Sequence, residues 1–170
     1  MSFKLIGALL VIASCGGCGF MMATHLKSKI RQLQVLIEAL NHMEYELQCR
    51  CTPLPQLCRQ AGEQGNGKVR KILLHVAEEL ESQIAPDAER CMACVLDKLS
   101  DVDPTLYAHF MQLGRTMGKF DISGQLKALD AVRHACATDL EELLKNKDQR
   151  LRSYQTLGLC AGAAVAILFV

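Results

Sequence analysis

The feature that most limits how this chain can fold is an apolar stretch without charged side chains at each end. Residues 5–24 form such a stretch, and a helix of that length rises about 30 Å, the thickness of the hydrocarbon core of a bilayer. Residues 153–170 also lack charged side chains, although a helix of that length reaches only about 27 Å. We therefore predict an N-terminal transmembrane helix over residues 3–25 and a C-terminal transmembrane segment over residues 153–170.

Basic residues flank the inner ends of both predicted spans. Lys27, Lys29 and Arg31 follow the first uncharged stretch, whereas Lys4 alone precedes it. Four more basic residues precede the second span: Lys145, Lys147, Arg150 and Arg152. The positive-inside rule then predicts that residues 26–152 form a cytoplasmic domain and that both termini lie outside.

Small residues recur at a spacing of four in both predicted spans. They are Ala13 and Gly17 in the first span and Gly158 and Gly162 in the second. Such pairs allow two membrane helices to approach closely, so we predict packing between the spans. The alternative is chance, because apolar segments are rich in glycine and alanine.

A second interpretation of the N-terminal stretch is a lipoprotein signal. Residues Ile12-Ala13-Ser14-Cys15 resemble the lipobox of bacterial lipoproteins, which would make the protein a lipid-modified extracytoplasmic binding protein anchored at Cys15. The sequence remains apolar after Cys15 as far as Ala23, where a mature lipoprotein usually begins with a polar tether. We therefore favour the membrane span.

The middle of the chain is predicted to be all-α. Hydrophobic residues make up 50% of the sequence but aromatic residues only 5%, which favours helices rich in leucine and alanine over strands. Steps of three and four residues predict a first helix that runs from the membrane to about Arg50, with a stripe of Leu26, Ile30, Leu33, Ile37, Leu40 and Leu47. A similar stripe after Ile122 predicts a last helix that continues into the C-terminal segment.

Turn and cap signals divide the region between these helices. Thr52-Pro53-Leu54 predicts a helix start with Thr52 as N-cap and Pro53 at the first helical position, and Gly65-Asn66-Gly67 ends that helix. Further helices are predicted over residues 68–83, from Ala85-Pro86-Asp87 through Leu99, and after Asp103-Pro104. The predicted fold is a small helical bundle of about six helices, whose long first and last helices extend into the N- and C-terminal transmembrane segments.

The cysteines are the first candidates for chemistry. Cys91 and Cys94 form a C-x-x-C pair, which Cys49, Cys51 and Cys58 with His75 or His109 could complete as a metal site. However, the pair lies inside a helical pattern where both thiols can face the core, and free cysteines in a reducing cytosol behave as small buried hydrophobes. We therefore expect no metal and no cofactor.

Catalytic motifs are absent from the sequence. His134 and Cys136 do not face each other on a helix, and there is no Gly-rich phosphate loop, H-E-x-x-H or G-x-S-x-G motif. All 18 acidic residues and 18 of the 19 basic residues lie in the middle region, so this region has no net charge. A nucleic-acid-binding domain is usually basic, so nucleic-acid binding is disfavoured. We expect a non-enzymatic protein without a small-molecule substrate.

The segment from Leu113 to Asp121, followed by Gln125, has a more specific sequence than the packing of a helical bundle requires, because it contains two glycines four residues apart. Gly114 predicts a close approach by a neighbouring helix, because glycine inside a helix costs about 1 kcal/mol relative to alanine. Gly118 predicts a left-handed C-cap, and Asp121 predicts the N-cap of the last helix. The simplest interpretation is an ordinary helix-turn-helix corner.

The order and spacing of these elements resemble the stage III sporulation protein AB family, small membrane proteins of endospore-forming bacteria. The residues that carry the resemblance span the chain: Lys4-Leu5-Ile6-Gly7-Ala8, Arg31-Gln32-Leu33, Leu36, Leu40, Glu46-Leu47, Thr52-Pro53-Leu54, Leu113-Gly114, Gly118, Asp121 and Gln125. Cys49 departs from the family, in which an aromatic residue is common before the Thr-Pro-Leu corner.

The resemblance implies a scaffold in the transport assembly between mother cell and forespore, which is required for endospore formation. The family's cytoplasmic domain is similar to that of the type II secretion inner-membrane platform protein. By this analogy the protein would lie in the mother-cell membrane around the forespore and dock partner subunits, including the ATPase stage III sporulation protein AA.

Overall fold

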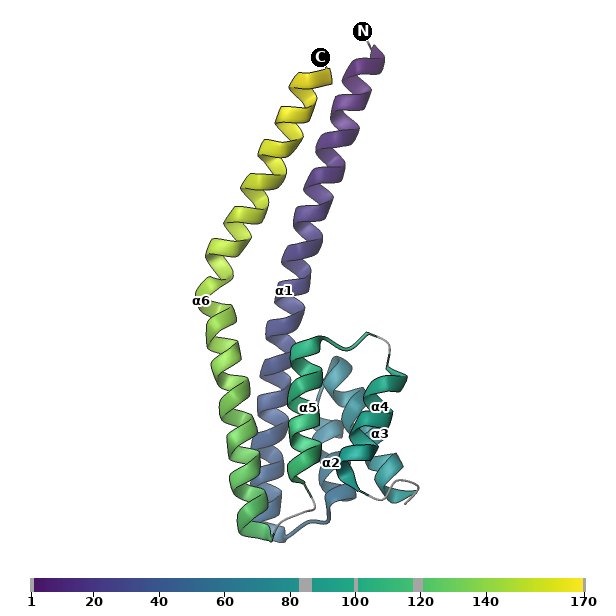
Figure 1. The fold of residues 1–170 in the computed structure, drawn as a ribbon, viewed down its shortest axis with the longest axis vertical. Coiled ribbons are helices and arrows are strands. Elements are labelled where there is room, and N and C mark those ends of the chain that lie inside the picture. The colour runs from purple at the N-terminus through teal and green to yellow at the C-terminus, as the bar shows by residue number, and fades with distance from the viewer. Residues whose placement is uncertain (1, 83–86, 100, 118–120, 170) are drawn as a thin grey trace. The chain divides into compact units, whose positions relative to one another are not determined.

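The computed structural model divides the chain into two compact units (Figure 1). Residues 31–140 form one unit, and residues 1–30 together with 141–170 form the other. The structure describes the backbone of residues 2–82, 87–99, 101–117 and 121–169, and the side chains of those between residues 21 and 145.

The described residues form six helices and no strands, which confirms the all-α class. The helices are α1 (Ser2–Arg50), α2 (Leu54–Gln64), α3 (Gly67–Glu81), α4 (Ala88–Lys98), α5 (Pro104–Thr116) and α6 (Ile122–Phe169). The prediction that the first and last helices are long is confirmed, since α1 has 49 residues and α6 has 48.

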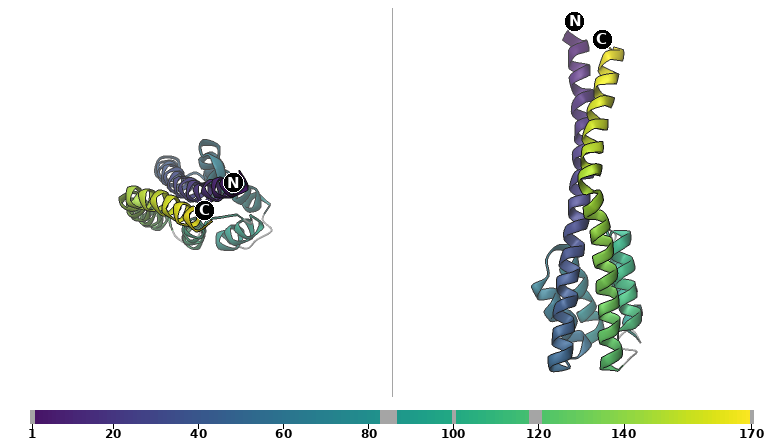
Figure 2. Two further views of the ribbon diagram at one scale, coloured as in Figure 1. Left: turned by 90° about the horizontal axis from the view of Figure 1, so that it is seen from above. Right: turned by 90° about the vertical axis from the view of Figure 1, so that its left-hand side faces the viewer.

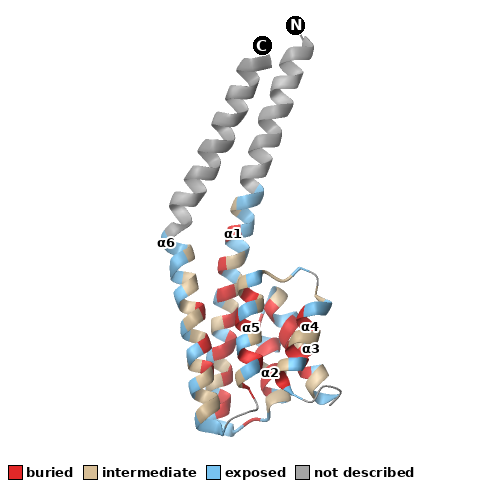
Figure 3. Ribbon diagram, in the orientation of Figure 1, coloured by how far each residue is buried: buried red, intermediate tan, exposed pale blue. Residues whose placement is uncertain are grey.

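The core of the unit formed by residues 31–140 is made of apolar, mostly aliphatic, side chains from all six helices. Figure 3 shows the buried positions of the short helices gathered where these helices face one another. Each helix contributes residues spaced by three or four, which is why the amphipathic stripes were visible in the sequence. Side chains with at most 2% exposed surface include Leu33, Leu36, Leu40, Met43, Leu57, Val69, Ile72, Leu73, Val95, Leu106, Phe110, Leu129 and Val132.

A polar contact also joins the two long helices to each other within this unit. Arg133 Nε on α6 lies 3.7 Å from Glu44 Oε2 on α1. Glu44 stands between Leu40 and Leu47, where the α1 stripe would place an apolar residue, and it pairs with α6 instead. The predicted stripe is wrong at Ile37, which is only partly buried, while Leu36 and Met43 fill the core. A helical stripe spans more than one residue per turn, so both neighbours satisfied the spacing rule.

The remaining residues, 1–30 and 141–170, group as the second unit. Among the described residues, no helical segment combines the length and apolar character that a membrane crossing requires. The predicted spans over residues 3–25 and 153–170 fall almost entirely outside the residues whose side chains are described, as do Ala13, Gly17, Gly158, Gly162 and Cys15. The boundaries at residues 25 and 153 remain predictions.

The start of α5 confirms the cap predicted at Asp103-Pro104, and α4 begins directly after Asp87, where a helix start was predicted. Asp103 Oδ1 accepts a hydrogen bond from the backbone N–H of Thr105 at 3.0 Å, and Asp87 Oδ1 accepts one from Arg90 at 2.9 Å. Gly65 is the C-cap of α2, as the Gly-Asn-Gly sequence predicts. The predicted cap of α2 is wrong: Pro53 is the N-cap, the helix begins at Leu54, and no side chain caps it.

Cys51 ends α1 in a left-handed conformation, with φ of 50°. Its backbone N–H donates to the Leu47 carbonyl at 3.2 Å, the bond that closes a left-handed helix end. A residue with a Cβ is strained in this conformation and glycine is not.

We therefore expect Cys51→Gly to raise the free energy of unfolding by about 1 kcal/mol. Cys49→Gly is the matched control, because Cys49 lies in the last turn of α1 and should lose about 0.5–1 kcal/mol to backbone entropy. Thermal unfolding of the detergent-solubilised chain, followed by circular dichroism, measures both changes. Equal effects of the two substitutions would show that the backbone at Cys51 is not strained.

Candidate interaction site

The corner between α1 and α2 is built around a buried carboxylate. Glu46 is only 5% exposed and accepts a hydrogen bond from the Thr52 hydroxyl at 3.4 Å. Arg50 Nη1, one helical turn further along α1, lies 3.6 Å from the other carboxylate oxygen. The Thr52 hydroxyl therefore donates to the Glu46 carboxylate instead of capping α2, since a buried charge requires a hydrogen-bonding partner.

Gly114 makes the close helix approach that its place in the sequence predicts. A Cβ added at Gly114 would lie 3.0 Å from the Met92 Cβ and 3.2 Å from both the Ala88 carbonyl oxygen and the Glu89 Cα. These atoms belong to α4, so α5 packs against the backbone of α4 at this point. The neighbouring Leu113 is buried, and Arg115 Nε donates to Glu89 Oε1 at 3.0 Å.

Asp121 caps the start of α6, as predicted. Its Oδ1 accepts a hydrogen bond from the backbone N–H of Gly124 at 3.1 Å, and its Oδ2 accepts one from the Ser123 hydroxyl at 2.7 Å. The Gln125 N–H donates to the Asp121 carbonyl at 2.9 Å, which closes the first turn of the helix. The C-cap predicted at Gly118 lies outside the described residues.

The hydrogen bonds at Asp121 make this cap sensitive to pH. The Ser123 hydroxyl, and then the Gly124 N–H, lower the pKa of the Asp121 carboxyl below its usual range. A carboxyl with a lowered pKa in the folded state adds stability above its unfolded pKa and loses that stability as the pH falls through its folded pKa.

We expect wild type to lose more stability between pH 5 and pH 2 than Asp121→Asn, which keeps a good cap without the titrating charge. Asp121→Ala should be less stable than both at neutral pH. Unfolding in urea across that pH range measures the difference. Parallel curves for wild type and Asp121→Asn would contradict the assignment.

The two corners that carry the motif residues lie at the same end of the bundle. Figure 1 shows α1 ending and α6 beginning at this end of the unit formed by residues 31–140, and the side view in Figure 2 agrees. Thr52-Pro53-Leu54 follows the end of α1, and Asp121 and Gln125 lie at the start of α6. We call these two corners the corner site. Gly114 lies outside it and faces α4.

The chain matches a known family along nearly its whole length. The family model for stage III sporulation protein AB matches residues 4–170. The chain belongs to the stage III sporulation protein AB family. The resemblance inferred from the motifs is thus confirmed, and membership of this family supports a role in sporulation.

Two individual proteins show the same relationship. Stage III sporulation protein AB of Bacillus subtilis (strain 168) is 28% identical over 173 residues, which cover 98% of this chain and 99% of that protein. A solved structure of a stage III sporulation protein AB has a TM-score of 0.61 and 21% identity, and the match covers 69% of this chain and 94% of that one. The structural likeness shows that the fold is shared.

The cysteines of this family member are distributed between core and surface. Cys58, Cys91 and Cys136 are buried, whereas Cys49 and Cys51 are exposed. Burial, with a smaller contribution from Cys91, raises the pKa of Cys58 to about 12, and burial followed by Asp139 raises the pKa of Cys136 to about 12. These buried thiols therefore stay protonated at neutral pH and behave as small hydrophobic side chains.

The candidate metal ligands form no metal site in the described part of the chain. No group of three or more His, Cys, Asp or Glu side chains there could hold a metal ion. Cys94 Sγ instead lies 3.7 Å from Glu79 Oε1. Of the two candidate histidines, His75 lies 3.3 Å from Glu78 on its own helix and His109 lies 2.8 Å from Asp139 on α6.

Two polar features were missed by the sequence analysis. His109 is buried, and its contact with Asp139 ties α5 to α6, a pairing between distant residues that no local pattern could reveal. The second feature is a groove rimmed by lysines at the start of α3. Its signal was present in the sequence, since Lys68, Arg70 and Lys71 cluster at a predicted helix start.

Proposed function

We propose that this protein is a non-enzymatic membrane scaffold subunit of the transport assembly between mother cell and forespore. In this proposal the bundle lies in the mother-cell cytoplasm and docks partner subunits, including the ATPase stage III sporulation protein AA. The apolar ends would hold the protein in the mother-cell membrane that surrounds the forespore. The proposal includes no cofactor and no small-molecule substrate.

The observation that carries this proposal is the structural role of the motif residues. Thr52 bonds a buried carboxylate, Gly114 permits contact between two helices, and Asp121 caps a helix. Residues with these roles preserve the shape of the bundle and of its corner site. A docking protein requires such a fixed shape, because binding depends on a preorganised surface.

Photo-cross-linking in sporulating cells tests the docking step. The protein would replace its relative in Bacillus subtilis and carry a photo-reactive residue in place of Tyr45, which is 60% exposed near the end of α1. We expect cross-links from this position to the ATPase or to another subunit of the assembly, identified by mass spectrometry. A photo-reactive residue at Glu63, exposed on α2, is the control position. If neither the ATPase nor any other assembly subunit is recovered, the proposal fails.

The membrane topology is tested separately by thiol labelling. Cys49 and Cys51 are the suitable probes because both are exposed, whereas Cys91 and Cys136 are buried. A variant that retains Cys49 alone should react with an impermeant maleimide only after protoplasts are permeabilised. Reaction in intact protoplasts would place the bundle outside the cell. An intact Met1 peptide in mass spectrometry would exclude lipid anchoring at Cys15.

A further inference from the structure

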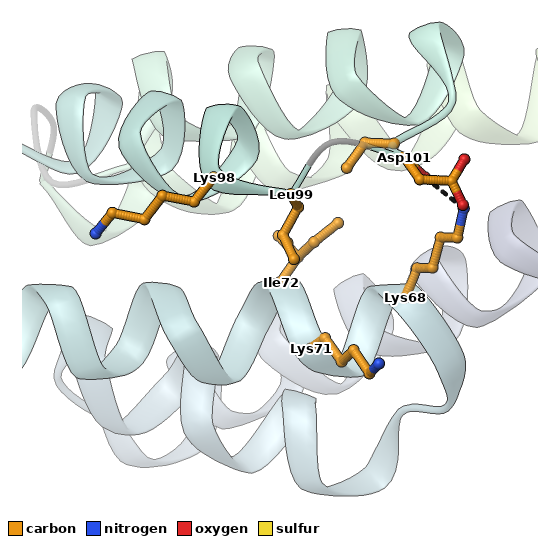
Figure 4. Close-up of a pocket in the computed structure, with 7 residues that line it drawn as sticks. Lys68, Lys71, Ile72, Lys98, Leu99 and Asp101 are labelled. Atoms are coloured by element: carbon orange, nitrogen blue, oxygen red, sulfur yellow. Dashed lines mark hydrogen bonds and ion pairs between the residues drawn. The ribbon is translucent and has the colours of Figure 1, made fainter.

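A groove lies between the start of α3 and the segment that follows α4. Its volume is about 250 Å³, and it is lined by Lys68, Lys71, Ile72, Lys98, Leu99, Asp101 and Val102. In Figure 4, Leu99 and Ile72 point toward each other, while the ends of Lys71 and Lys98 are directed away from this apolar centre. The groove therefore has an apolar floor and a rim of ammonium groups. We call it the lysine groove.

The rim keeps an excess of positive charge. Lys68 Nζ pairs with Asp101 Oδ2 at 2.7 Å, and Lys98 Nζ lies 3.6 Å from Glu79 Oε1. Within the described part of the chain, Lys71 has no ion-pair partner. Three lysines thus face two carboxylates, although residues 31–140 taken together are net acidic.

Lys68 and Lys71 lie near the N-terminus of α3, where their positive charge lowers the stability of the helix. The N-terminus of a helix carries a partial positive charge, so it favours acidic side chains and disfavours basic ones. The first turn of α3 contains no acidic residue, and its N-cap Asn66 makes no side-chain hydrogen bond to the helix. Basic side chains at a helix N-terminus are unfavourable for the helix, and such departures from local preference are typical of functional surfaces. Their place at the edge of an apolar groove therefore indicates a binding surface.

We propose that the lysine groove docks an acidic segment of a partner protein. The segment would insert an aliphatic side chain against Leu99 and Val102, the partly exposed apolar residues of the groove, and place its carboxylates beside Lys71 and Lys98. The apolar residues favour a protein partner over a lipid surface because they are recessed: Ile72 has no exposed surface and Leu99 is only partly exposed. A surface that enters a bilayer must instead project its apolar side chains.

This inference rests on the proposed scaffold function and adds the chemistry of one docking surface. A direct binding assay tests it with the full chain in zwitterionic detergent. The probe is a short fluorescein-labelled peptide in which two leucines one helical turn apart are flanked by glutamates. The control peptides replace either the glutamates with lysines or the leucines with serines. Fluorescence anisotropy reports the affinity of each peptide.

We expect the glutamate–leucine peptide to bind and both control peptides to bind at least about tenfold more weakly, because charge and apolar contact act together. The double substitution Lys71→Glu and Lys98→Glu should weaken binding by about tenfold or more. Lys71→Glu alone should also weaken binding, and Arg70→Glu is its matched control with the same change of charge, since Arg70 is exposed next to Lys71 but does not line the groove. It should change the affinity by less than about twofold. Circular dichroism confirms that each variant is folded.

Three results would overturn the proposal. The first is equal binding of the peptide to wild type and to the double variant, and the second is no binding of the peptide at all. The third is lysine-dependent binding of dihexanoyl-phosphatidylglycerol without peptide binding, which would assign the groove to an anionic headgroup. None of these results affects photo-cross-linking from Tyr45, so failure of the lysine groove and failure of the scaffold function can be distinguished.

Discussion

Replacement of Gly114 by leucine is expected to destabilise the bundle by about 3 kcal/mol, because α4 leaves no space for a side chain at this position. Even the Cβ would lie within 3.2 Å of the Ala88 carbonyl oxygen and the Glu89 Cα, which are backbone atoms and cannot rotate away. Helices α4 and α5 would have to separate. Urea unfolding of the detergent-solubilised chain measures the loss.

Gly114→Ala tests the same contact with a smaller change. Alanine gains about 1 kcal/mol in helix propensity over glycine, so a net loss of stability would show that the clash outweighs this gain. Ala108→Leu is the matched control because it introduces leucine at an exposed position on the same helix. Its effect should stay within about 0.5 kcal/mol. If Gly114→Leu were as mild as this control, the close approach of α4 and α5 would be wrong.

Gly114 also illustrates what could be predicted from the sequence. A glycine in a strongly helical stretch has a local cost, so its presence indicated a neighbouring backbone without revealing which helix supplied it. Asp87, Asp103 and Asp121 were predictable for a similar reason, since an N-cap is recognised by residues a few positions apart. Local rules therefore located the helices and most of their ends.

The predictions that were wrong or missing concern side chains whose hydrogen-bonding partners are not apparent from local sequence rules. Thr52 had the right residue type and position to cap α2, but the buried Glu46 carboxylate takes its hydroxyl. His109 and Asp139 are separated by 30 residues, and only the packing of α5 on α6 brings them to 2.8 Å. Tertiary contacts override local preference at such positions. The lysine groove was likewise not predicted: the basic cluster at the start of α3 is visible in the sequence, but the other side of the groove comes from a separate segment after α4.

Phe110→Ala is expected to have the largest effect on stability, a loss of about 3–5 kcal/mol. Phe110 has no exposed surface and is among the largest fully buried side chains of the described core. Removing its ring leaves a cavity that the surrounding helices can fill only in part. The free energy of unfolding in urea, with the slope of the transition checked for two-state behaviour, measures the loss.

Tyr45→Ala is the control that connects this stability effect to function. It removes an aromatic ring of similar size, but Tyr45 is 60% exposed, so the change in stability should stay within about 0.5 kcal/mol. A sporulation defect in Phe110→Ala can therefore follow from unfolding alone. A defect in Tyr45→Ala, with stability unchanged, would require a lost contact with a partner near the corner site. Equal stability losses in the two variants would contradict the burial of Phe110 and the exposure of Tyr45.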